Sequence, residues 1–572
     1  MSDRELIVLK FGGSVLTDES TLRRAVHEIH RWRRDDYRVV AVVSALAGTT
    51  DELLRECQDL AGESADHAVA AVVAGGELHC ASLLGLLLDR AGIPARVLSP
   101  GVVNLVAEGA ALDADPLTLD AGAILAASDR DSVVVVPGYV ARDSQGRTVL
   151  LGRGGSDLTA LFVASRLHAR NCRLVKDVDG LYAWDPAVPG PRPSRYASVT
   201  WQDALRTDGS IVQHKAIRFA ERHGRSFELG ALNTEHPTTV GEGPTRPGAG
   251  SSPRTPLRVG LLGLGTVGGG VFELVRGMPE CFEVTSICVR DLDRPRGEAV
   301  DPQLLTTDPQ ETLNRADVVV EAWGALEPAR EWVERALGAG KHVVSANKTL
   351  VAVAGRELAD LALREGSSLA YSAAVGGCLP LLERLTRAAG DVALVRGVLN
   401  GTANFVLDGL DAGRELESVL AEARALGFAE LDAQRDLSGA DAADKLAVLA
   451  GVLGLRLAPE AVEREAIDAE VAERIRHSTT GTVLRQVSTL RITAAGARAE
   501  VRLEELEPGD PLAAVRAEEN AAVVELTSGE RSFVAGRGAG RWPTAESVVG
   551  DLLEIERRRG ARAEEVSAHR VV

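Results

Sequence analysis

Short hydrophobic runs alternate with longer helix-compatible segments along the first part of the chain. Residues 5–10, 39–44 and 133–136 are hydrophobic runs of strand length, and each leads into a turn-forming stretch rich in glycine, serine or proline. Strands that alternate with helix-length segments are typical of an α/β domain with a largely parallel sheet. The pattern therefore predicts such a domain over residues 1–243.

The same alternation returns later in the chain. Residues 257–262, 282–289, 316–322 and 340–348 again have the pattern of buried strands. Residues 244–256 read PTRPGAGSSPRTP and show no hydrophobic periodicity, which is typical of a linker. We therefore expect a second α/β domain at 257–385 and a third region at 386–572.

A glycine-rich turn opens the second α/β domain. Residues 257–271 read LRVGLLGLGTVGGGV, in which Gly263, Gly265 and Gly268 form G-x-G-x-x-G. Between a strand and a helix, these glycines permit a tight turn, close approach to a pyrophosphate and close helix–strand packing. The helix N-terminus then offers free N–H groups to the phosphates. The motif predicts a dinucleotide site, with Thr266 and Val267 in the turn.

The end of the next strand bears on the choice between NAD and NADP. Arg290 and Asp291 are adjacent there. An acidic residue at this position binds the ribose 2′-hydroxyl of NAD, whereas an arginine meets the 2′-phosphate of NADP. Both NAD and NADP stay open as the cofactor, and we favour NADP because Arg290 can bind its 2′-phosphate. Lys348 follows a later strand, at the edge where open α/β sheets bind ligands.

Two loops of the first domain suit phosphate and carboxylate ligands. Lys10 ends the first strand, and the backbone N–H groups of Gly12 and Gly13 follow it. The loop LGRGGSD at 151–157 contains Arg153, which can clamp a carboxylate through two parallel hydrogen bonds, and Asp157. The two loops together indicate phosphoryl transfer to or from a small acid.

Composition excludes several classes of protein. The net charge of −18 argues against general binding to nucleic acids or anionic membranes. The six cysteines form no C-x-x-C pair, which suits a reducing compartment and gives no metal cage. We find neither a signal-peptide pattern nor a run of about 18 apolar residues. A cytoplasmic protein without a membrane span is therefore expected.

Lysine is scarce in this chain. Of the 64 basic residues only six are lysines, namely Lys10, Lys176, Lys215, Lys341, Lys348 and Lys445. A compact ammonium group can approach a phosphate as a point charge, and it can give up a proton when it is desolvated. The retained lysines are therefore candidate functional residues, above all those that fall within motifs.

The first domain resembles the amino-acid kinase family, and most closely aspartate kinase. The resemblance rests on KFGGSV, VVSALAGTTD, LGRGGSDLTA and KDVDGLYAWDP. It implies an amino-acid kinase fold, a mostly parallel sheet sandwich that transfers the ATP γ-phosphoryl group, with Mg²⁺, to the β-carboxylate of aspartate. It further implies that Lys10 neutralises the transferring group and that the amino acid is held by Glu77, Arg153 and Asp157. The implied ATP-binding residues are Lys10, Gly12, Gly13, Ser14, Asp177, Asp179, Tyr182 and Asp185.

Three departures from that family pattern concern the kinase activity. The usual Thr-Ser after the glycines is Ser14-Val15, and in the KVLHPRT-like run the lysine is replaced by Ser210 and the histidine by Gln213. Lys215 lies close in sequence and is a candidate to compensate. The linker is also too short to hold the paired regulatory domains that commonly follow aspartate kinases, so feedback by threonine or lysine through such domains is expected to be weak or absent.

The rest of the chain resembles homoserine dehydrogenase. The resemblance rests on GLGTVGGGV, SANK, AVGG, NGTANFVL, GFAE, DLSGADAADK and DPLAAVRAEENAAV. It implies a Rossmann domain, an α+β catalytic and dimerisation domain, and hydride transfer between a nicotinamide and aspartate 4-semialdehyde. It further implies that Lys445 supplies a proton, that Asp441 orients it, and that Lys348 lies near the reacting centre. The implied substrate-binding residues are Glu430, Asp436 and Thr402.

Two departures from the family pattern affect its monovalent-cation site. The acid that often precedes AxVGG is replaced by Ser372, and the family's third glycine is Cys378. The backbone carbonyls of Val375 and Gly377 remain candidate ligands for Na⁺ or K⁺. The second threonine of the family's GTTN is Ala403.

The sequence thus predicts a fused enzyme of the aspartate pathway, acting on small molecules as a homo-oligomer, either a dimer or a tetramer. Its two reactions are not consecutive, because another enzyme must first reduce aspartyl phosphate. Three alternatives stay open: a catalytically silent first domain that senses an amino acid or nucleotide, a sister acyl phosphotransferase, and a dehydrogenase for a different short aldehyde.

Overall fold

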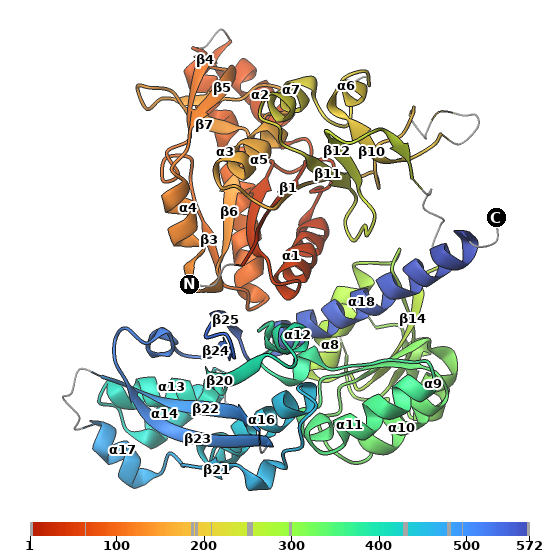
Figure 1. Ribbon diagram of the computed structural model, residues 1–572, viewed down its shortest axis with the longest axis vertical. Coiled ribbons are helices and arrows are strands. Elements are labelled where there is room, and N and C mark those ends of the chain that lie inside the picture. Colours follow the sequence, from red (N-terminus) through yellow and green to blue (C-terminus); the bar gives the residue numbers. More distant parts are fainter. Residues whose placement is uncertain are drawn as a thin grey trace. The chain divides into compact units, whose positions relative to one another are not determined.

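The chain forms two compact units, one made of residues 3–89 and 94–253 and the other mainly of 254–572. We call them the N-terminal and C-terminal units (Figure 1). The computed structural model describes residues 4–62, 65–184, 188, 193–207, 209–248, 255–296, 300–426, 433–476, 482–494 and 496–568.

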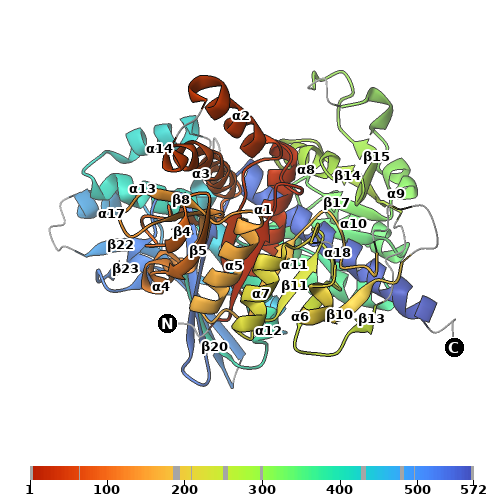
Figure 2. The ribbon, with the colours of Figure 1, turned by 90° about the horizontal axis from the view of Figure 1, so that it is seen from above.

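A mostly parallel sheet forms the centre of the N-terminal unit (Figures 1 and 2). Its strands lie in the order β13 (Arg246–Pro247), β10 (Tyr196–Thr200), β12 (Thr238–Gly241), β11 (Phe227–Gly230), β9 (Asn171–Val175), β1 (Leu6–Phe11), β2 (Arg38–Val43), β6 (Val133–Pro137) and β3 (Ala95–Val97). Strand β1 pairs in parallel with both β2 and β9. The carboxyl ends of these central strands therefore meet at one edge of the sheet.

A smaller sheet and several helices complete this unit. The small sheet has the order β5 (Asp113–Thr118), β4 (Val106–Ala110), β7 (Val140–Arg142) and β8 (Thr148–Leu150). The helices are α1 (Glu19–Arg34), α2 (Thr49–Ala61), α3 (Asp66–Arg90), α4 (Ala121–Ala127), α5 (Gly155–Arg166), α6 (Trp201–Ala204) and α7 (His214–Arg222). Asp18 starts α1 with a capping box, in which its carboxylate accepts from the backbone N–H of Thr21.

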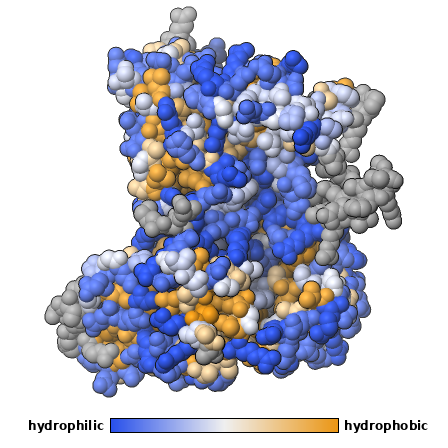
Figure 3. Space-filling view, in the orientation of Figure 1, coloured by the Kyte–Doolittle hydropathy of each residue, from blue (hydrophilic) through white to orange (hydrophobic). Residues whose placement is uncertain are grey.

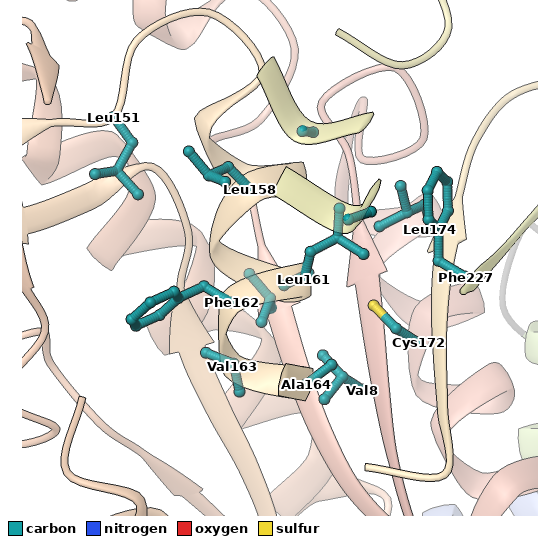
Figure 4. Packing of buried hydrophobic residues seen from close by; sticks show 14 of the residues in the cluster. Val8, Leu151, Leu158, Leu161, Phe162, Val163, Ala164, Cys172, Leu174 and Phe227 are labelled. Carbon is teal, nitrogen blue, oxygen red and sulfur yellow. The ribbon is translucent and has the colours of Figure 1, made fainter. Parts of the chain in front are cut away.

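Helix α5 packs on one face of the central strands. Its side chains Leu158 and Leu161 belong to one buried cluster with Val8 of β1 and with Cys172 and Leu174 of β9 (Figure 4). Since side chains alternate along a strand, the residues of β1 that share the face of Val8 also point towards α5. Packing thereby brings the first turn of α5 to the carboxyl ends of β1 and β9.

Helix α3 bears on the expected absence of a membrane span. It is long and apolar enough to cross a membrane by length and composition alone, although Glu77 and His79 interrupt its apolar residues. This is weak evidence for a span, because the core helix of a globular protein passes the same test. The helix buries Glu77 and Cys80 within the N-terminal unit.

Hydrophilic residues cover most of the face shown in Figure 3, with hydrophobic patches on both units.

The C-terminal unit begins with a parallel sheet of dinucleotide-binding type. Its strands lie in the order β16 (Leu305–Thr306), β15 (Phe282–Cys288), β14 (Leu257–Leu262), β17 (Val318–Glu321), β18 (His342–Ser345) and β19 (Leu369–Ala370). All its pairings are parallel within the described residues. The connecting helices are α8 (Thr266–Arg276), α9 (Pro309–Arg315), α10 (Ala329–Gly338) and α11 (Lys348–Arg364).

A mainly antiparallel sheet follows. Its strands lie in the order β21 (Glu463–Arg464), β23 (Gly496–Leu506), β22 (Val483–Thr493), β20 (Val392–Val398), β24 (Glu519–Leu526) and β25 (Arg531–Arg537). The helices beside it are α12 (Leu381–Arg387), α13 (Gly401–Asp411), α14 (Leu416–Ala425), α15 (Gln434–Leu437), α16 (Ala440–Val452) and α17 (Ala469–Arg476). The final helix α18 (Arg541–Ala568) returns to the first sheet, where Ala545, Val548 and Leu552 pack with Val271 of α8.

This architecture confirms the predicted fold class, with an amino-acid kinase domain, a Rossmann domain and an α+β catalytic domain in that order. One predicted element differs. The strand expected at 340–348 is limited to β18, and Lys348 is instead the first residue of α11. The side chain of Asn347 accepts a hydrogen bond from Leu350 N and so starts that helix.

Candidate functional site

The glycine turn after β14 has the geometry that a dinucleotide requires. Gly263 has a φ of 110°, and a Cβ added at Gly268 would lie 2.2 Å from the carbonyl oxygen of Gly263. A Cβ at Gly265 would meet nothing within 4 Å. Helix α8 then starts at Thr266 without a side-chain cap, so its first N–H groups are available to an anion. The residues present therefore fit a pyrophosphate.

Arg290 and Asp291, the charged residues after β15, differ in their contacts. The carboxylate of Asp291 accepts a hydrogen bond of 2.9 Å from the backbone N–H of Asp293. Arg290 is exposed, and in the described part of the chain it makes no ion pair. The guanidinium is thus free to meet a phosphate beside the strand end, whereas Asp291 is engaged in its own turn.

Two lysines of the C-terminal unit share one buried carboxylate. Lys445 and Asp441 lie four residues apart on α16, and Lys445 Nζ is 2.8 Å from Asp441 Oδ2. Lys348, which starts α11, pairs with Asp441 Oδ1. Burial alone would raise the pKa of Asp441, but the two ammonium groups hold it well below its usual range. Burial would lower the pKa of Lys348, but the carboxylates of Asp441, Asp436 and Asp444 together raise it above its usual value.

Asparagine residues that the sequence interpretation missed orient this cluster. Asn400 Nδ2 donates to Asp441 Oδ2 at 2.9 Å and to Asp436 Oδ1 at 2.7 Å. The carbonyl oxygen of Leu399 accepts from Lys445 Nζ at 2.5 Å and from Asn520 Nδ2 at 3.1 Å. Asn400 lies in the motif NGTANF and Asn520 in DPLAAVRAEENAAV, but neither was singled out as a site residue.

Of the other residues predicted in this unit, Asp436 lies next to the cluster, because it shares Asn400 with Asp441. Asp436 is on α15, where burial raises the pKa of its carboxyl, and Thr402 is in the first turn of α13. Glu430 lies outside the described residues. Ser372 is held by the buried Asp551, which accepts from the Ser372 hydroxyl at 2.7 Å and from its backbone N–H at 2.9 Å.

The segment that carries the candidate cation ligands bends sharply. Val375 is fully buried, and Gly376 and Gly377 have φ values of 80° and 53°. Cys378 is also buried, and its thiol donates to the carbonyl oxygen of Pro543. The described residues contain no group of three or more His, Cys, Asp or Glu side chains placed to hold a metal ion. A monovalent cation at Val375 and Gly377 therefore stays a prediction.

A second shared carboxylate lies in the N-terminal unit. Lys10 Nζ is 2.7 Å from Asp157 Oδ1, and Lys176 Nζ is 2.8 Å from Asp157 Oδ2. All three side chains are buried. Burial would raise the pKa of Asp157, but the two lysines lower it to about 2. In the sequence Lys176 was noted as one of the rare lysines and as the first residue of KDVDGLYAWDP, but it was given no role in the site.

Glu77 of α3 faces the same cluster. Burial raises the pKa of its carboxyl to about 8, while Lys10 and the backbone N–H of Ala45 oppose that rise. Its Oε2 atom is buried and has no hydrogen-bond partner among the described residues. Burial also lowers the pKa of Lys10 to about 8, with Asp157 opposing and Lys176 assisting. An orphaned acceptor beside two ammonium groups fits a ligand that carries both an amine and an anion.

The glycine loops bring backbone close to this cluster. A Cβ added at Gly12 would lie 2.8 Å from Lys10 Nζ, and one added at Gly13 would lie 3.3 Å from the carbonyl oxygen of Ala45. Ser14 follows and is exposed. Helix α5 starts after Gly154, whose φ is 76°, and no side chain caps it. Its first turn therefore offers N–H groups close to Asp157.

The other predicted kinase residues are more dispersed. Arg153 and Asp177 are exposed, and in the described part of the chain Arg153 makes no ion pair. Asp179 accepts from the hydroxyl of Tyr182 at 2.7 Å, and its Oδ2 lies 3.4 Å from Arg195 Nε. Asp185 lies outside the described residues.

The suggestion that Lys215 compensates for Ser210 is wrong. Lys215 Nζ is 2.7 Å from Asp113 Oδ1 and 3.3 Å from Asp115 Oδ1. It also donates to the carbonyl oxygens of two further residues, Ala114 and Leu151. Because these acceptors hold its ammonium group, Lys215 supplies no free positive charge.

The two sites together define a chain with a kinase-type amino-acid domain and an NAD-binding dehydrogenase domain. Family models match accordingly: the amino acid kinase family at residues 5–227, the NAD-binding domain of homoserine dehydrogenase at 263–372 and homoserine dehydrogenase at 379–553. The chain belongs to the homoserine dehydrogenase family and carries an amino acid kinase domain ahead of it.

Several named relatives match the C-terminal part. Homoserine dehydrogenase of Corynebacterium glutamicum is 39% identical over 336 residues, which are 55% of this chain and 75% of that protein. Homoserine dehydrogenase of Synechocystis sp. is 35% identical over 316 residues, or 52% of this chain and 73% of that protein. A crystal structure of homoserine dehydrogenase from Thiobacillus denitrificans is 35% identical, with a TM-score of 0.49, and covers 54% of this chain and 74% of that one.

Proposed function

We propose that this chain is a bifunctional enzyme that phosphorylates aspartate with ATP and reduces aspartate 4-semialdehyde to homoserine with NADPH. The observation that carries the proposal is the repeated arrangement of two lysines on one buried aspartate. Each unit has its own copy, at Asp157 and at Asp441.

In the dehydrogenase reaction the nicotinamide cofactor supplies the hydride. The developing alkoxide needs a proton, and Lys445 is suited to give it, because its ammonium group is buried and oriented by Asp441 and by the carbonyl oxygen of Leu399. Lys348 places a second positive charge near the same point. Asp436, with Thr402 and Glu430, would bind the amino end of the substrate.

In the kinase reaction, catalysis consists mainly of positioning and charge neutralisation. Lys10 would meet the transferring phosphoryl group, and the orphaned Oε2 of Glu77 would accept from the α-amine of aspartate. Arg153 is free to clamp the α-carboxylate. Mg²⁺ would be held largely by the ATP phosphates, as this ion usually is in kinases.

NADP is preferred over NAD in this proposal. Arg290 is exposed and has no ion pair within the described residues, so a 2′-phosphate can reach it, whereas Asp291 is engaged by its own turn. The C-terminal sheet and helices would also form a dimer or tetramer interface. A monovalent cation at Val375 and Gly377 belongs to the same proposal.

A substrate panel tests the dehydrogenase part. Purified protein should give a higher kcat/KM with aspartate 4-semialdehyde than with other short aldehydes, and a higher value with NADPH than with NADH. Preference for any other aldehyde would overturn the substrate assignment.

The second candidate function is a silent sensor in the N-terminal unit. Ser210 and Gln213 favour it, because they replace two residues of the family pattern, and Gln213 packs over Gly154 at the start of α5. The intact Lys10–Asp157 pair opposes it. ATP binding without aspartate-dependent ADP release would favour the sensor.

A further inference from the structure

Lys176 reaches the carboxylate that Lys10 already neutralises. Its Nζ lies 2.8 Å from Asp157 Oδ2 and 3.1 Å from Oδ1, and its side chain is 9% exposed. In the described part of the chain, Asp157 is its only acidic partner. One carboxylate therefore faces two ammonium groups.

Strand register places the two lysines on the same face of the sheet. Lys10 of β1 lies opposite Leu174 of β9, and Lys176 follows two residues later, just beyond the end of β9. Since side chains alternate, Leu174 and Lys176 point to the side that α5 covers, as Lys10 does. The two ammonium groups converge where parallel strands end, which is where open α/β sheets bind ligands.

The charges around Lys10 do not balance. Asp157 and Glu77 are the acids that face it, and Lys176 is the neighbouring cation. Because burial raises the pKa of Glu77 to about 8, that carboxyl offsets the two ammonium groups less than a fully ionised carboxylate would. Two buried ammonium groups thus share the single carboxylate of Asp157, and burying a charge is costly unless it is fully paired. This imbalance indicates an anionic ligand.

Ser210 and Lys215, the two positions near the family lysine, do not supply this second charge. The family lysine is replaced by Ser210, and the ammonium of Lys215 is held by Asp113, Asp115 and two carbonyl oxygens. Lys176 is the buried lysine, within the described residues, that joins Lys10 on Asp157.

We propose that Lys176 is a second phosphate-binding lysine of the kinase site, which contacts the transferring phosphoryl group together with Lys10 in place of the lysine lost at Ser210. This rests on the proposed kinase function. A bond forms between the β-carboxylate oxygen of aspartate and the γ-phosphorus, and the bond from that phosphorus to the bridging oxygen of ATP breaks. ADP leaves with the electron pair. Both lysines stay protonated and stabilise the negative charge on the phosphoryl oxygens.

The test compares Lys176→Gln with the wild-type full-length protein, using aspartate-dependent formation of aspartyl hydroxamate. Loss of one charge contact to a transition state typically lowers kcat by about 10²- to 10³-fold, and we expect a loss in that range. Lys176→Arg, which keeps the charge, should recover part of the rate. Lys341→Gln, the same change at a lysine of the other unit, is the matched control and should keep the wild-type kinase rate.

A pH profile separates this role from a merely structural one. Removing Lys176 removes a positive charge beside Lys10, so the pKa of Lys10 rises. The kinase rate requires protonated Lys10 and falls as pH passes that pKa, so the alkaline limb should move to higher pH in Lys176→Gln. An unmoved limb, or an unchanged kcat and KM for ATP, would overturn the proposal. Normal dehydrogenase activity in the same preparation shows that the variant is folded.

A measurement of ATP affinity distinguishes failure of the Lys176 proposal from failure of the proposed kinase function. If the wild-type protein binds ATP in calorimetry but forms no hydroxamate, the aspartate kinase assignment fails, and Lys176→Gln should still weaken ATP binding by about tenfold, as expected for loss of one charged contact. Equal affinities for ATP in that case, or no ATP binding by the wild-type protein, would overturn the role of Lys176 as well.

Discussion

At the scale of single residues, four of the six lysines lie in two clusters of the same composition. Lys10 and Lys176 share Asp157, and Lys348 and Lys445 share Asp441. In each cluster the shared carboxylate is buried. A chain that otherwise uses arginine has thus kept lysine where a compact charge is needed.

Lys445 is the residue on which hydride transfer should depend most. We expect Lys445→Ala to lower kcat by about 10²- to 10⁴-fold, the usual contribution of a general acid, with NADPH affinity nearly unchanged. Asp441 keeps Lys348 as a partner, so no buried carboxylate is left unpaired. Steady-state kinetics and NADPH titration would measure both quantities. Lys341→Ala, outside the site, is the control, and retained turnover in Lys445→Ala would remove this residue from the mechanism.

Arg290 should set the preference for NADP. We expect Arg290→Ala to raise the KM for NADPH by about 10-fold or more, because a charge-assisted contact to the 2′-phosphate is lost, and to leave the KM for NADH nearly unchanged. Kinetics with the two cofactors would measure the change. A similar rise in both KM values, or in neither, would contradict this role.

The sequence could name most side chains of both clusters, because Lys10, Asp157, Lys348, Asp441 and Lys445 fall within local motifs. It could not show that Lys176 joins Lys10, because that contact depends on the pairing of β9 with β1, which are far apart in sequence. Asn520 was missed for the same reason. Lys215 was misjudged because closeness in sequence did not reveal its carboxylate partners Asp113 and Asp115.

At the scale of elements, the turn between β14 and α8 combines two kinds of glycine. Gly268 faces backbone, since its added Cβ would lie 2.2 Å from the oxygen of Gly263, whereas Gly265 faces open space. Gly268 is therefore needed by the fold and Gly265 by the ligand. The hydrophobic pattern predicted this strand–turn–helix unit correctly, but it extended the later strand at 340–348 too far, because Asn347 caps a helix there.

The difference between Gly265 and Gly268 predicts opposite behaviour of their alanine variants. Gly265→Ala should keep the wild-type Tm and weaken NADPH binding, because its methyl group enters the space of the pyrophosphate. Gly268→Ala should lower the Tm, because the backbone must shift to relieve the clash. Thermal unfolding with and without NADPH measures both effects. Gly269→Ala, inside the helix with its nearest atom at 3.9 Å, is the control; tight NADPH binding by Gly265→Ala would contradict this reading.

At the scale of the whole molecule, the chain is two compact units, each with its own lysine–aspartate–lysine cluster. Strand β13 ends at Pro247 and β14 begins at Leu257, so the intervening segment has no room for a regulatory domain. Each site is built from residues of its own unit. The two activities should therefore be separable by single substitutions, and the central claim is that the N-terminal unit is an active kinase.

The measurement that tests this claim most directly is aspartate-dependent phosphoryl transfer, trapped as aspartyl hydroxamate on the full-length protein. The wild-type protein should form hydroxamate, whereas Lys10→Ala should form almost none and keep its dehydrogenase rate. Asp157 stays paired with Lys176 in that variant, so the unit is expected to fold. Absence of hydroxamate with the wild-type protein, while homoserine dehydrogenase activity is normal, would contradict the account and leave the N-terminal unit as a sensor or a kinase for another acid.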